Sequence, residues 1–309
     1  MRILALVPGD VSEQILFFPA LQALRERYPS AKIHAIVEPQ AMAAYEVCAS
    51  VDAVMPFGFK ESLSLADLGD LLGRMRDTYY DVAIVLGDDA WLRFFVWLSG
   101  IPKRVGYRGK ANFLLTDAIA PPSGQYAASA YCDLLQALGL SATSPLPQIR
   151  LKKVDLSWAE RERDRLLGKT DRDYLLLYPG SEYPVSSWVK IAKIFFEKRP
   201  ELPVVVIVGP EEEDVVEQFK ADAPDLPVMR PAGVGEFAAA IAGASLLLAP
   251  DSAPLQLAVA TQTPVVGLFG SSDPARELPA EGPFRAVRSN NGKLSSITAE
   301  QAIEAVFPS

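Results

Sequence analysis

Short runs of apolar residues recur along the chain, and each run is closed by glycine, proline or aspartate. Residues 3–7, 32–37 and 82–86 are such runs in the first half, and residues 204–208 form one in the second half. Longer segments between them carry apolar side chains at helical spacing. Strands that are apolar along their whole length are typical of parallel sheets with helices on both faces. The pattern therefore predicts an α/β protein.

The first half continues with the same two patterns. Helices are predicted at residues 11–28, 63–79 and 126–138, the last ended by Gly139, and strands at residues 52–57, 104–107 and 114–120. Pro19 lies inside the first helical pattern and predicts either a kink or a later start of that helix. The segment WLRFFVWL at residues 91–98 could be interpreted as a stripe that contacts a membrane. It is predicted as a core helix instead, because it has eight residues and a helix that spans a membrane needs about 20.

The pattern restarts after a segment rich in serine and proline, residues 141–148, which is the predicted linker. The second half is predicted to contain helices at residues 157–167 and 235–244, strands at residues 174–178 and 204–208, and a final helix with a capping box from Thr298 to Gln301. We therefore predict two doubly wound domains, residues 1–145 and 146–309. Packing of the final helix back on the first domain is an open alternative.

Residues 246–274 are the stretch around which the second half is organised. They read as a buried strand, a turn at Pro250-Asp251-Ser252, a helix and a second buried strand. Asp251 and Ser252 both have side chains that can cap the helix. In such a unit the helix N-terminus lies at the carboxyl edge of the sheet, where its free N–H groups bind anions. This turn is therefore the first candidate for a ligand site.

Composition narrows the classes of function. The net charge of −8 argues against nucleic acid as a partner and against polybasic attachment to lipid. One histidine, His34, and two distant cysteines without CxxC spacing argue against a metal site, and His34 is assigned no role. The apolar run at the N-terminus is too short for a signal peptide. We expect a soluble cytoplasmic protein.

The same stretch resembles the nucleotide-binding segment of glycosyltransferase family 9, which contains the heptosyltransferases of lipopolysaccharide core assembly. The matching residues are D-S-A-P-L-Q-L-A-V-A and then P-V-V-G-L-F-G-S-S-D-P. Similar matches occur at Pro19–Leu24, at Tyr80–Ile84, at Pro179-Gly180-Ser181 and at Trp188. The resemblance implies a GT-B fold, in which two Rossmann-like domains face each other across a cleft. It also implies a nucleotide in the C-terminal half, an acceptor towards the N-terminal half and neither metal nor cofactor.

The resemblance also implies a catalytic carboxylate after the first strand, which would accept the proton of the attacking hydroxyl. An ungapped alignment places Glu13 on the family's aspartate, and Asp10 is the alternative if a gap is allowed. Either residue can instead be an ordinary acidic residue at a helix N-terminus, favoured there by the helix dipole. The two roles stay open at this stage.

The implied nucleotide-sugar site consists of Gly180, Ser181, Ser186, Asp251, Ser252, Ala253 and Gln256. Three of these depart from the family pattern: Ser186 replaces a lysine, Gln256 replaces a histidine and Ala253 replaces a glycine. Lys190 could replace the missing cation. Hydroxyl, amide and backbone N–H groups can bind phosphate, but less strongly than full positive charges do.

We therefore predict a metal-independent inverting glycosyltransferase. It would move a sugar from an ADP-heptose-like nucleotide-sugar to a saccharide or lipid-linked acceptor. The alternative is a catalytically degenerate GT-B protein that acts as a binding or scaffold protein. Two further partners stay open: peripheral contact with a membrane and, for the degenerate protein, a protein partner.

Overall fold

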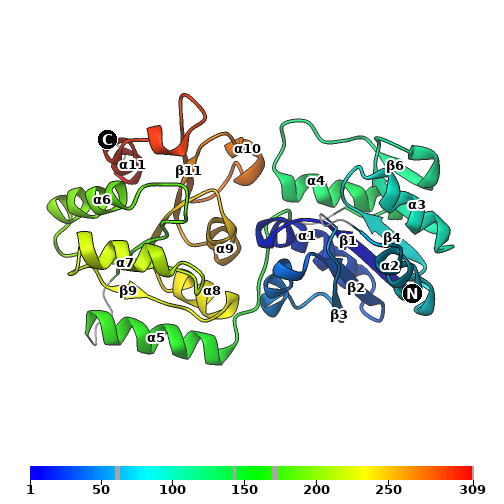
Figure 1. Ribbon diagram of the computed structural model, residues 1–309, viewed down its shortest axis with the longest axis horizontal. Helices are drawn as coiled ribbons and strands as arrows, with labels where there is room; N and C mark the ends of the chain where they lie inside the picture. The colour runs from blue at the N-terminus through cyan, green and yellow to red at the C-terminus, as the bar shows by residue number, and fades with distance from the viewer. Residues whose placement is uncertain (60–62, 142–143, 169–172, 308–309) are drawn as a thin grey trace. The chain divides into compact units, whose positions relative to one another are not determined.

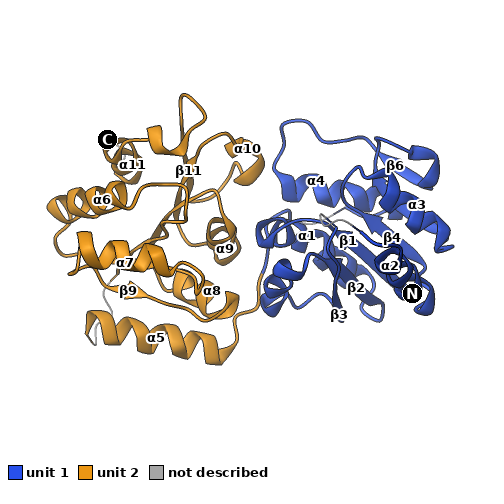
Figure 2. Cartoon of the chain, in the orientation of Figure 1, with its two compact units in different colours: residues 1–148 blue, residues 149–309 orange. Residues whose placement is uncertain are grey.

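The chain forms two compact units, residues 1–148 and 149–309 (Figure 2). The computed structural model describes residues 1–59, 63–141, 144–168 and 173–307. Within the predicted linker at residues 141–148, residues 142–143 lie outside this described part.

Unit 1 contains one parallel sheet with the strand order β3-β2-β1-β4-β5-β6 (Figure 1). Its strands are β1 (Arg2–Val7), β2 (Lys32–Val37), β3 (Ala53–Pro56), β4 (Val82–Val85), β5 (Lys103–Tyr107) and β6 (Asp117–Ile119). Its helices are α1 (Val11–Arg27), α2 (Leu65–Asp77), α3 (Ala90–Leu98) and α4 (Ala127–Asp133), with 3₁₀ segments η1 (Pro39–Val47), η2 (Asn112–Leu114) and η3 (Leu134–Leu138).

Unit 2 contains a second parallel sheet, with the order β12-β11-β10-β7-β8-β9. Its strands are β7 (Leu175–Leu177), β8 (Val204–Ile207), β9 (Val228–Met229), β10 (Leu246–Pro250), β11 (Val265–Phe269) and β12 (Phe284–Arg288). Its helices are α5 (Lys153–Leu167), α6 (Val185–Lys198), α7 (Glu213–Asp222), α8 (Val234–Ala242), α9 (Ala253–Thr261), α10 (Pro274–Glu277) and α11 (Ala299–Val306), with the 3₁₀ segment η4 (Leu294–Ser296).

The two sheets have the same topology. Counted along each unit, the strands lie in the order 3-2-1-4-5-6, which is the Rossmann order. The order reverses between β1 and β4 in unit 1 and between β7 and β10 in unit 2. Ligands of such sheets bind outside the carboxyl ends of the strands at this reversal. The topology therefore predicts ligand sites at the loops that follow these four strands.

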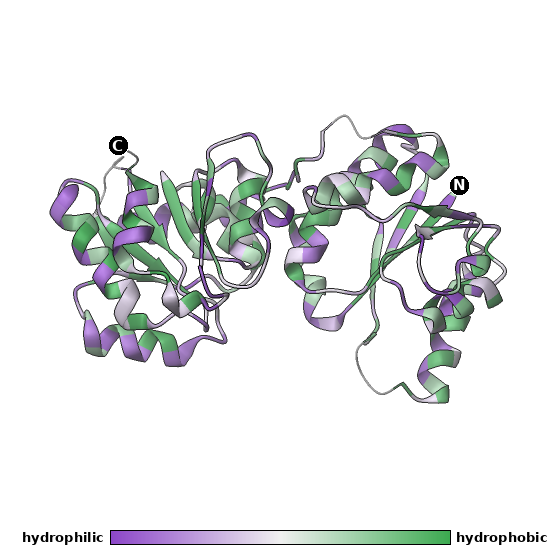
Figure 3. Cartoon of the chain, turned by 90° about the horizontal axis from the view of Figure 1, so that it is seen from above, coloured by the Kyte–Doolittle hydropathy of each residue, from purple (hydrophilic) through white to green (hydrophobic). Residues whose placement is uncertain are grey.

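Helices cover both faces of each sheet, as the apolar strands require. In unit 2, α6 contacts α7 and α11, whereas α8 contacts α5 and α9. One core is built from strand residues such as Leu177 and Val206 together with Trp188 and Phe195 of α6. The strands β4, β7, β8 and β11 are apolar along their length, whereas β5 and β12 carry basic side chains. The helices have mixed faces (Figure 3). The predicted α/β class is confirmed.

Several predicted elements are found with small shifts. The helix α1 runs without interruption through Pro19, so the predicted later start is wrong. The helix α5 begins at Lys153, earlier than predicted. The capping box of Thr298 and Gln301 is present at α11, and this helix packs on α6 within unit 2. None of the helices in the described part of the chain is long and apolar enough to cross a membrane.

Candidate functional site at two carboxyl edges

In unit 2, two loops meet at the reversal of strand order. One follows β7 and contains Gly180, and the other follows β10 and contains Asp251. Gly180 has a φ of +57°, a left-handed conformation that disfavours a side chain. A Cβ atom at Gly180 would also lie 3.1 Å from Cγ of Pro250. The glycine therefore allows close contact between the two loops.

The helix α9 begins at this edge, directly after β10. Ser252 is its N-cap residue, but its hydroxyl donates a hydrogen bond back to the carbonyl of Pro250 at 2.8 Å. The expected capping by the Ser252 side chain is therefore wrong. The N–H groups of the first turn, including that of Ala253, have no acceptor within the helix. Asp251 is exposed beside them.

A second helix N-terminus lies at the same edge, because α6 follows the β7 loop. Ser181 in the loop and Ser186 in the first turn of α6 are both exposed. Trp188 is fully buried and donates its indole N–H to the carbonyl of Pro179 at 3.1 Å. The buried indole holds the loop against α6, so that two helix N-termini are available to an anion.

Gln256 occupies a different environment from the exposed serines. Its side chain is fully buried, and its amide nitrogen donates to the carbonyl of Glu277 at 3.0 Å. Its amide oxygen has no hydrogen-bond partner among the described residues. Gln256 thus joins the start of α9 to α10. The helix α10 follows β11 at this edge and carries an exposed cation, Arg276.

The expected substitute cation, Lys190, is engaged elsewhere. Its ammonium group lies 2.6 Å from a carboxylate oxygen of Glu300, the second residue of α11. Both side chains are more than half exposed. Lys190 therefore joins α6 to α11 through an exposed ion pair.

Two residues at this edge were not found from the sequence. Glu212 follows β8, the strand next to β7, and accepts hydrogen bonds from the Tyr178 hydroxyl at 2.9 Å and from the Gly209 N–H at 2.5 Å. Burial and the charge of Glu212 raise the pKa of Tyr178. In Rossmann units an acidic residue near the second strand binds the ribose. In the sequence, only the Gly-Pro after β8 indicated that a loop of possible functional importance follows this strand.

In unit 1, both candidate carboxylates lie just after β1, Asp10 as the N-cap of α1 and Glu13 in its first turn. Asp10 is exposed and caps α1, accepting the N–H of Glu13 at 3.2 Å. Glu13 is half-buried and accepts a hydrogen bond from the hydroxyl of Tyr131 on α4. A Cβ atom at Gly9 would lie 2.6 Å from Cβ of Glu13, so only glycine allows the Glu13 side chain this position. Tyr131 was not found from the sequence.

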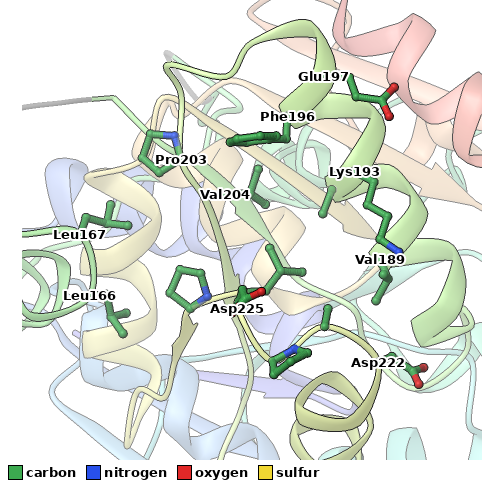
Figure 4. A pocket seen from close by; sticks show the side chains of 15 residues that line it. Leu166, Leu167, Val189, Lys193, Phe196, Glu197, Pro203, Val204, Asp222 and Asp225 are labelled. Atoms are coloured by element: carbon green, nitrogen blue, oxygen red, sulfur yellow. The ribbon is translucent and has the colours of Figure 1, made fainter.

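An apolar cavity of about 780 Å³ in unit 2 lies away from these loops (Figure 4). It is lined by Leu166 and Leu167 of α5, by Phe196 of α6 and by Pro203 and Pro227, which precede β8 and β9. It is therefore at the amino edge of the sheet, opposite the candidate site.

Among the described residues, no group of three or more His, Cys, Asp or Glu side chains could hold a metal ion.

Comparison with known proteins adds four findings. The model of Glycosyltransferase family 9 (heptosyltransferase) matches residues 69–306. The chain is 25% identical to the photosynthetic NDH subunit of subcomplex B 1 of Arabidopsis thaliana, over 97% of this chain and 70% of that protein. It is 23% identical to lipopolysaccharide heptosyltransferase 3 of Escherichia coli, over 84% of this chain and 81% of the other. The structure of E. coli ADP-heptose lipopolysaccharide heptosyltransferase II has a TM-score of 0.79 and 20% identity, over 99% of this chain and 97% of that one.

Proposed function

The chain belongs to glycosyltransferase family 9, and from that premise we propose that it transfers a sugar from an ADP-heptose-like donor to a saccharide or lipid-linked acceptor. The family and the GT-B fold of two Rossmann-like domains, both predicted from the sequence, are thereby confirmed. The donor, the acceptor and the residues that bind them belong to the proposal.

The donor diphosphate would bind at the carboxyl edge of unit 2. The observation that carries this proposal is the contact of the Gly180 loop with Pro250, which brings the N-termini of α6 and α9 to one edge. N–H groups at helix N-termini bind phosphate oxygens well. The hydroxyls of Ser181 and Ser186 would add two donors, and Glu212 would accept from the ribose.

The leaving diphosphate carries negative charge that the site must neutralise. Arg276 is the cation that we propose for this role, because α10 is held against α9 by Gln256 and Arg276 has no ion-pair partner among the described residues. A hydroxyl of the acceptor would attack the anomeric carbon as the bond from that carbon to the phosphate oxygen breaks. Attack opposite to the leaving group inverts the configuration.

The proton of the attacking hydroxyl would pass to Glu13 or Asp10. Glu13 is the better candidate, because Tyr131 and Gly9 hold its carboxylate in one position, whereas Asp10 already caps α1. A base held in one position and free of a capping role gains from its orientation towards the attacking hydroxyl.

A thermal-shift screen with ADP-, UDP-, GDP- and CDP-sugars tests donor binding, because a ligand that binds only the folded state raises its stability. We expect ADP-sugars to raise the unfolding temperature. Ser252→Trp should abolish this shift by filling the turn before α9, and Arg276→Gln should reduce it. Ser157→Trp, at an exposed position of α5, is the matched control. A full shift in Ser252→Trp would move the donor site away from this turn.

Transfer is tested with the donor that binds and a panel of saccharide acceptors. Glu13→Gln should lower kcat by roughly 100-fold or more while leaving the donor-induced thermal shift intact. Asp10→Asn is the matched comparison, and a larger loss in that variant would assign the base to Asp10.

A second candidate function is that of a non-catalytic subunit of a larger assembly. The observation that favours it is the similarity, over nearly the whole chain, to a plant protein named as a subunit of a complex. The replacement of the family's lysine by Ser186 and of its histidine by Gln256 agrees with a non-catalytic role. This candidate predicts no transfer with any donor, even with a donor that binds.

A further inference from the structure

Gln14 is a fully buried polar residue on α1, one position after the candidate base Glu13. Its amide nitrogen donates to the carbonyl of Val7 at 3.0 Å and to the carbonyl of Gly9 at 3.3 Å. Val7 ends β1, and Gly9 lies in the short connection between β1 and α1. The buried amide therefore ties this connection to the first turn of the helix.

The amide oxygen of Gln14 has a partner on another element. The hydroxyl of Tyr45 in η1 donates to this oxygen at 2.9 Å, and η1 contacts α1. Tyr45 is buried, and its ring packs edge-on against that of Phe18 on α1, with centroids 5.5 Å apart. Burial raises the pKa of Tyr45, so its hydroxyl stays a hydrogen-bond donor near neutral pH.

These partners fix which way the amide faces. The carbonyls of Val7 and Gly9 can only accept hydrogen bonds, so they need the amide nitrogen of Gln14. A reversed amide would place its oxygen against both carbonyls and leave them without this donor. Because a buried polar group without a partner is costly, the hydroxyl of Tyr45 stabilises the one orientation in which the nitrogen donates to the connection.

The Glu13 side chain lies directly against the backbone that Gln14 holds. A Cβ atom at Gly9 would lie 2.6 Å from both Cβ and Cγ of Glu13. The carbonyl of the same Gly9 is one of the two acceptors of the Gln14 amide. At its far end, the Glu13 carboxylate accepts from the hydroxyl of Tyr131 on α4. The position of the carboxylate thus depends on where Gly9 lies.

We propose that Gln14 and Tyr45 are positioning residues for the catalytic base. Together they hold the connection at Gly9, and through it the carboxylate of Glu13, in the geometry that proton transfer requires. Both are buried, so they act through the base and not on the substrate. A displacement of about 1 Å can lower a rate by roughly 100-fold. The inference rests on the proposed function, in which Glu13 accepts the proton of the attacking hydroxyl.

Sugar transfer by the full chain tests the inference. Tyr45→Phe removes one hydroxyl and should lower kcat by roughly 10-fold, whereas Gln14→Leu removes the whole amide and should lower kcat by roughly 30-fold. The KM for the donor and the thermal shift with ADP-sugars should stay unchanged, because the donor is proposed to bind unit 2. If Gln14→Leu does not fold, Tyr45→Phe alone decides.

Tyr174→Phe is the matched control for the loss of a buried hydroxyl. Tyr174 is buried in unit 2, and its hydroxyl donates to the carbonyl of Ala240 at 2.9 Å. This variant should lose about as much stability as Tyr45→Phe does and keep the natural kcat. An equal fall in kcat would show that lost stability, and not a displaced base, lowers the rate.

A double variant separates positioning from a purely structural role. Glu13→Gln removes the base, so the addition of Tyr45→Phe should lower the residual kcat no further. A further loss as large as the loss in the natural background would mean that Tyr45 does not act through Glu13. That result would overturn the inference.

Hydrogen exchange tests the fixed connection without turnover. The backbone amides of residues 9–13 should exchange roughly 10-fold faster in Tyr45→Phe, a factor that corresponds to about one lost hydrogen bond. Tyr174→Phe should leave them unchanged. Unchanged exchange in Tyr45→Phe and Gln14→Leu, or a natural kcat in both, would overturn this inference alone. A natural protein that transfers no sugar would instead refute the proposed function, and with it any base to position.

Discussion

At the scale of single residues, the guanidinium of Arg93 joins more groups than any donor at the candidate site. It contacts the Asp88 carboxylate and the carbonyls of Gly87, Tyr107 and Lys110. Arg93→Met should lower the free energy of unfolding by about 3 kcal/mol, because it leaves the carbonyls of Gly87, Tyr107 and Lys110 without their charged donor. Urea denaturation measures this loss.

Arg165→Met is the control for that loss. Arg165 is 62% exposed and pairs with Glu162 one turn away on α5. An exposed pair contributes about 0–1 kcal/mol, so this variant should unfold almost as the natural protein does. Equal losses in the two variants would contradict the view that Arg93 anchors the loop that follows β5.

Ser186 stands where the family carries lysine, in the exposed first turn of α6. If this turn faces the donor diphosphate, Ser186→Lys adds a charge-assisted hydrogen bond and should tighten donor binding by roughly 10-fold. Isothermal titration measures the change. Ser157→Lys, which adds the same charge on α5, should leave the affinity unchanged. Unchanged affinity in Ser186→Lys would count against a phosphate at this turn.

His34 should give the protein a pH-dependent stability, because it is the only histidine in the chain. Its ring lies 2.8 Å from the Tyr80 hydroxyl, and burial lowers its pKa. The unfolded chain therefore takes up a proton near pH 6.5, while the folded chain takes it up only at lower pH. Stability is complete above about pH 6.5 and should fall as the pH drops towards the folded pKa.

Unfolding in urea at several pH values between about 5 and 7 measures this slope. His34→Gln removes the titrating group and keeps an acceptor for Tyr80, so its stability should be nearly flat in this window. A slope as steep as that of the natural protein would assign the titration to another group.

Residue types and spacing alone could predict part of the candidate site. The turns at Gly180 and Ser252 follow apolar runs, and the structure has both at the carboxyl edge of one sheet. The partners of Glu13 and Gln256 could not be predicted. Tyr131 and Glu277 belong to elements distant in sequence, and no local pattern encodes such contacts.

At the scale of elements, two N-cap hydroxyls form different hydrogen bonds. The Thr298 hydroxyl accepts the N–H of Gln301 at 3.2 Å, as the capping box predicts, whereas the Ser252 hydroxyl donates to a carbonyl before its helix. The difference is that Thr298 is followed three residues later by a side chain that completes the box. The residue three positions after Ser252 is the buried Leu255, whose apolar side chain cannot complete a box.

Thr298→Ala should therefore destabilise unit 2 by about 1 kcal/mol, the usual value of an N-cap hydroxyl. Thr298→Ser keeps the hydroxyl and should cost much less. Chemical denaturation compares the two variants. A loss of stability in Thr298→Ser equal to that in Thr298→Ala would mean that the methyl group, and not the cap, stabilises α11.

The elements themselves were largely predictable, because strands buried on both faces are apolar throughout. The exposed side of α3, with Phe94 and Trp97, was not, since apolar side chains do not reveal which of them lack a covering element. The helices α6 and α7 were not predicted, although both bury one side and expose the other.

At the scale of the whole molecule, each unit has its own six-stranded sheet and its own core. Residues 1–148 and residues 149–309, expressed separately, should each unfold cooperatively. If the donor binds unit 2, ADP-sugars should stabilise the second fragment only. Thermal unfolding of both fragments with and without donor measures this, and stabilisation of the first fragment would contradict the proposed donor site.

The shared strand order also affects how the site forms in time. The strand β10 pairs with β7 although α6, β8, α7, β9 and α8 lie between them in the chain. Contacts between segments so distant in sequence form slowly, because a long loop must close first. During synthesis, β7 must therefore wait with an unpaired apolar edge until β10 has left the ribosome. The nascent second unit should depend on chaperones more than a protein built from local contacts does, and its ligand site should be among the last parts to assemble.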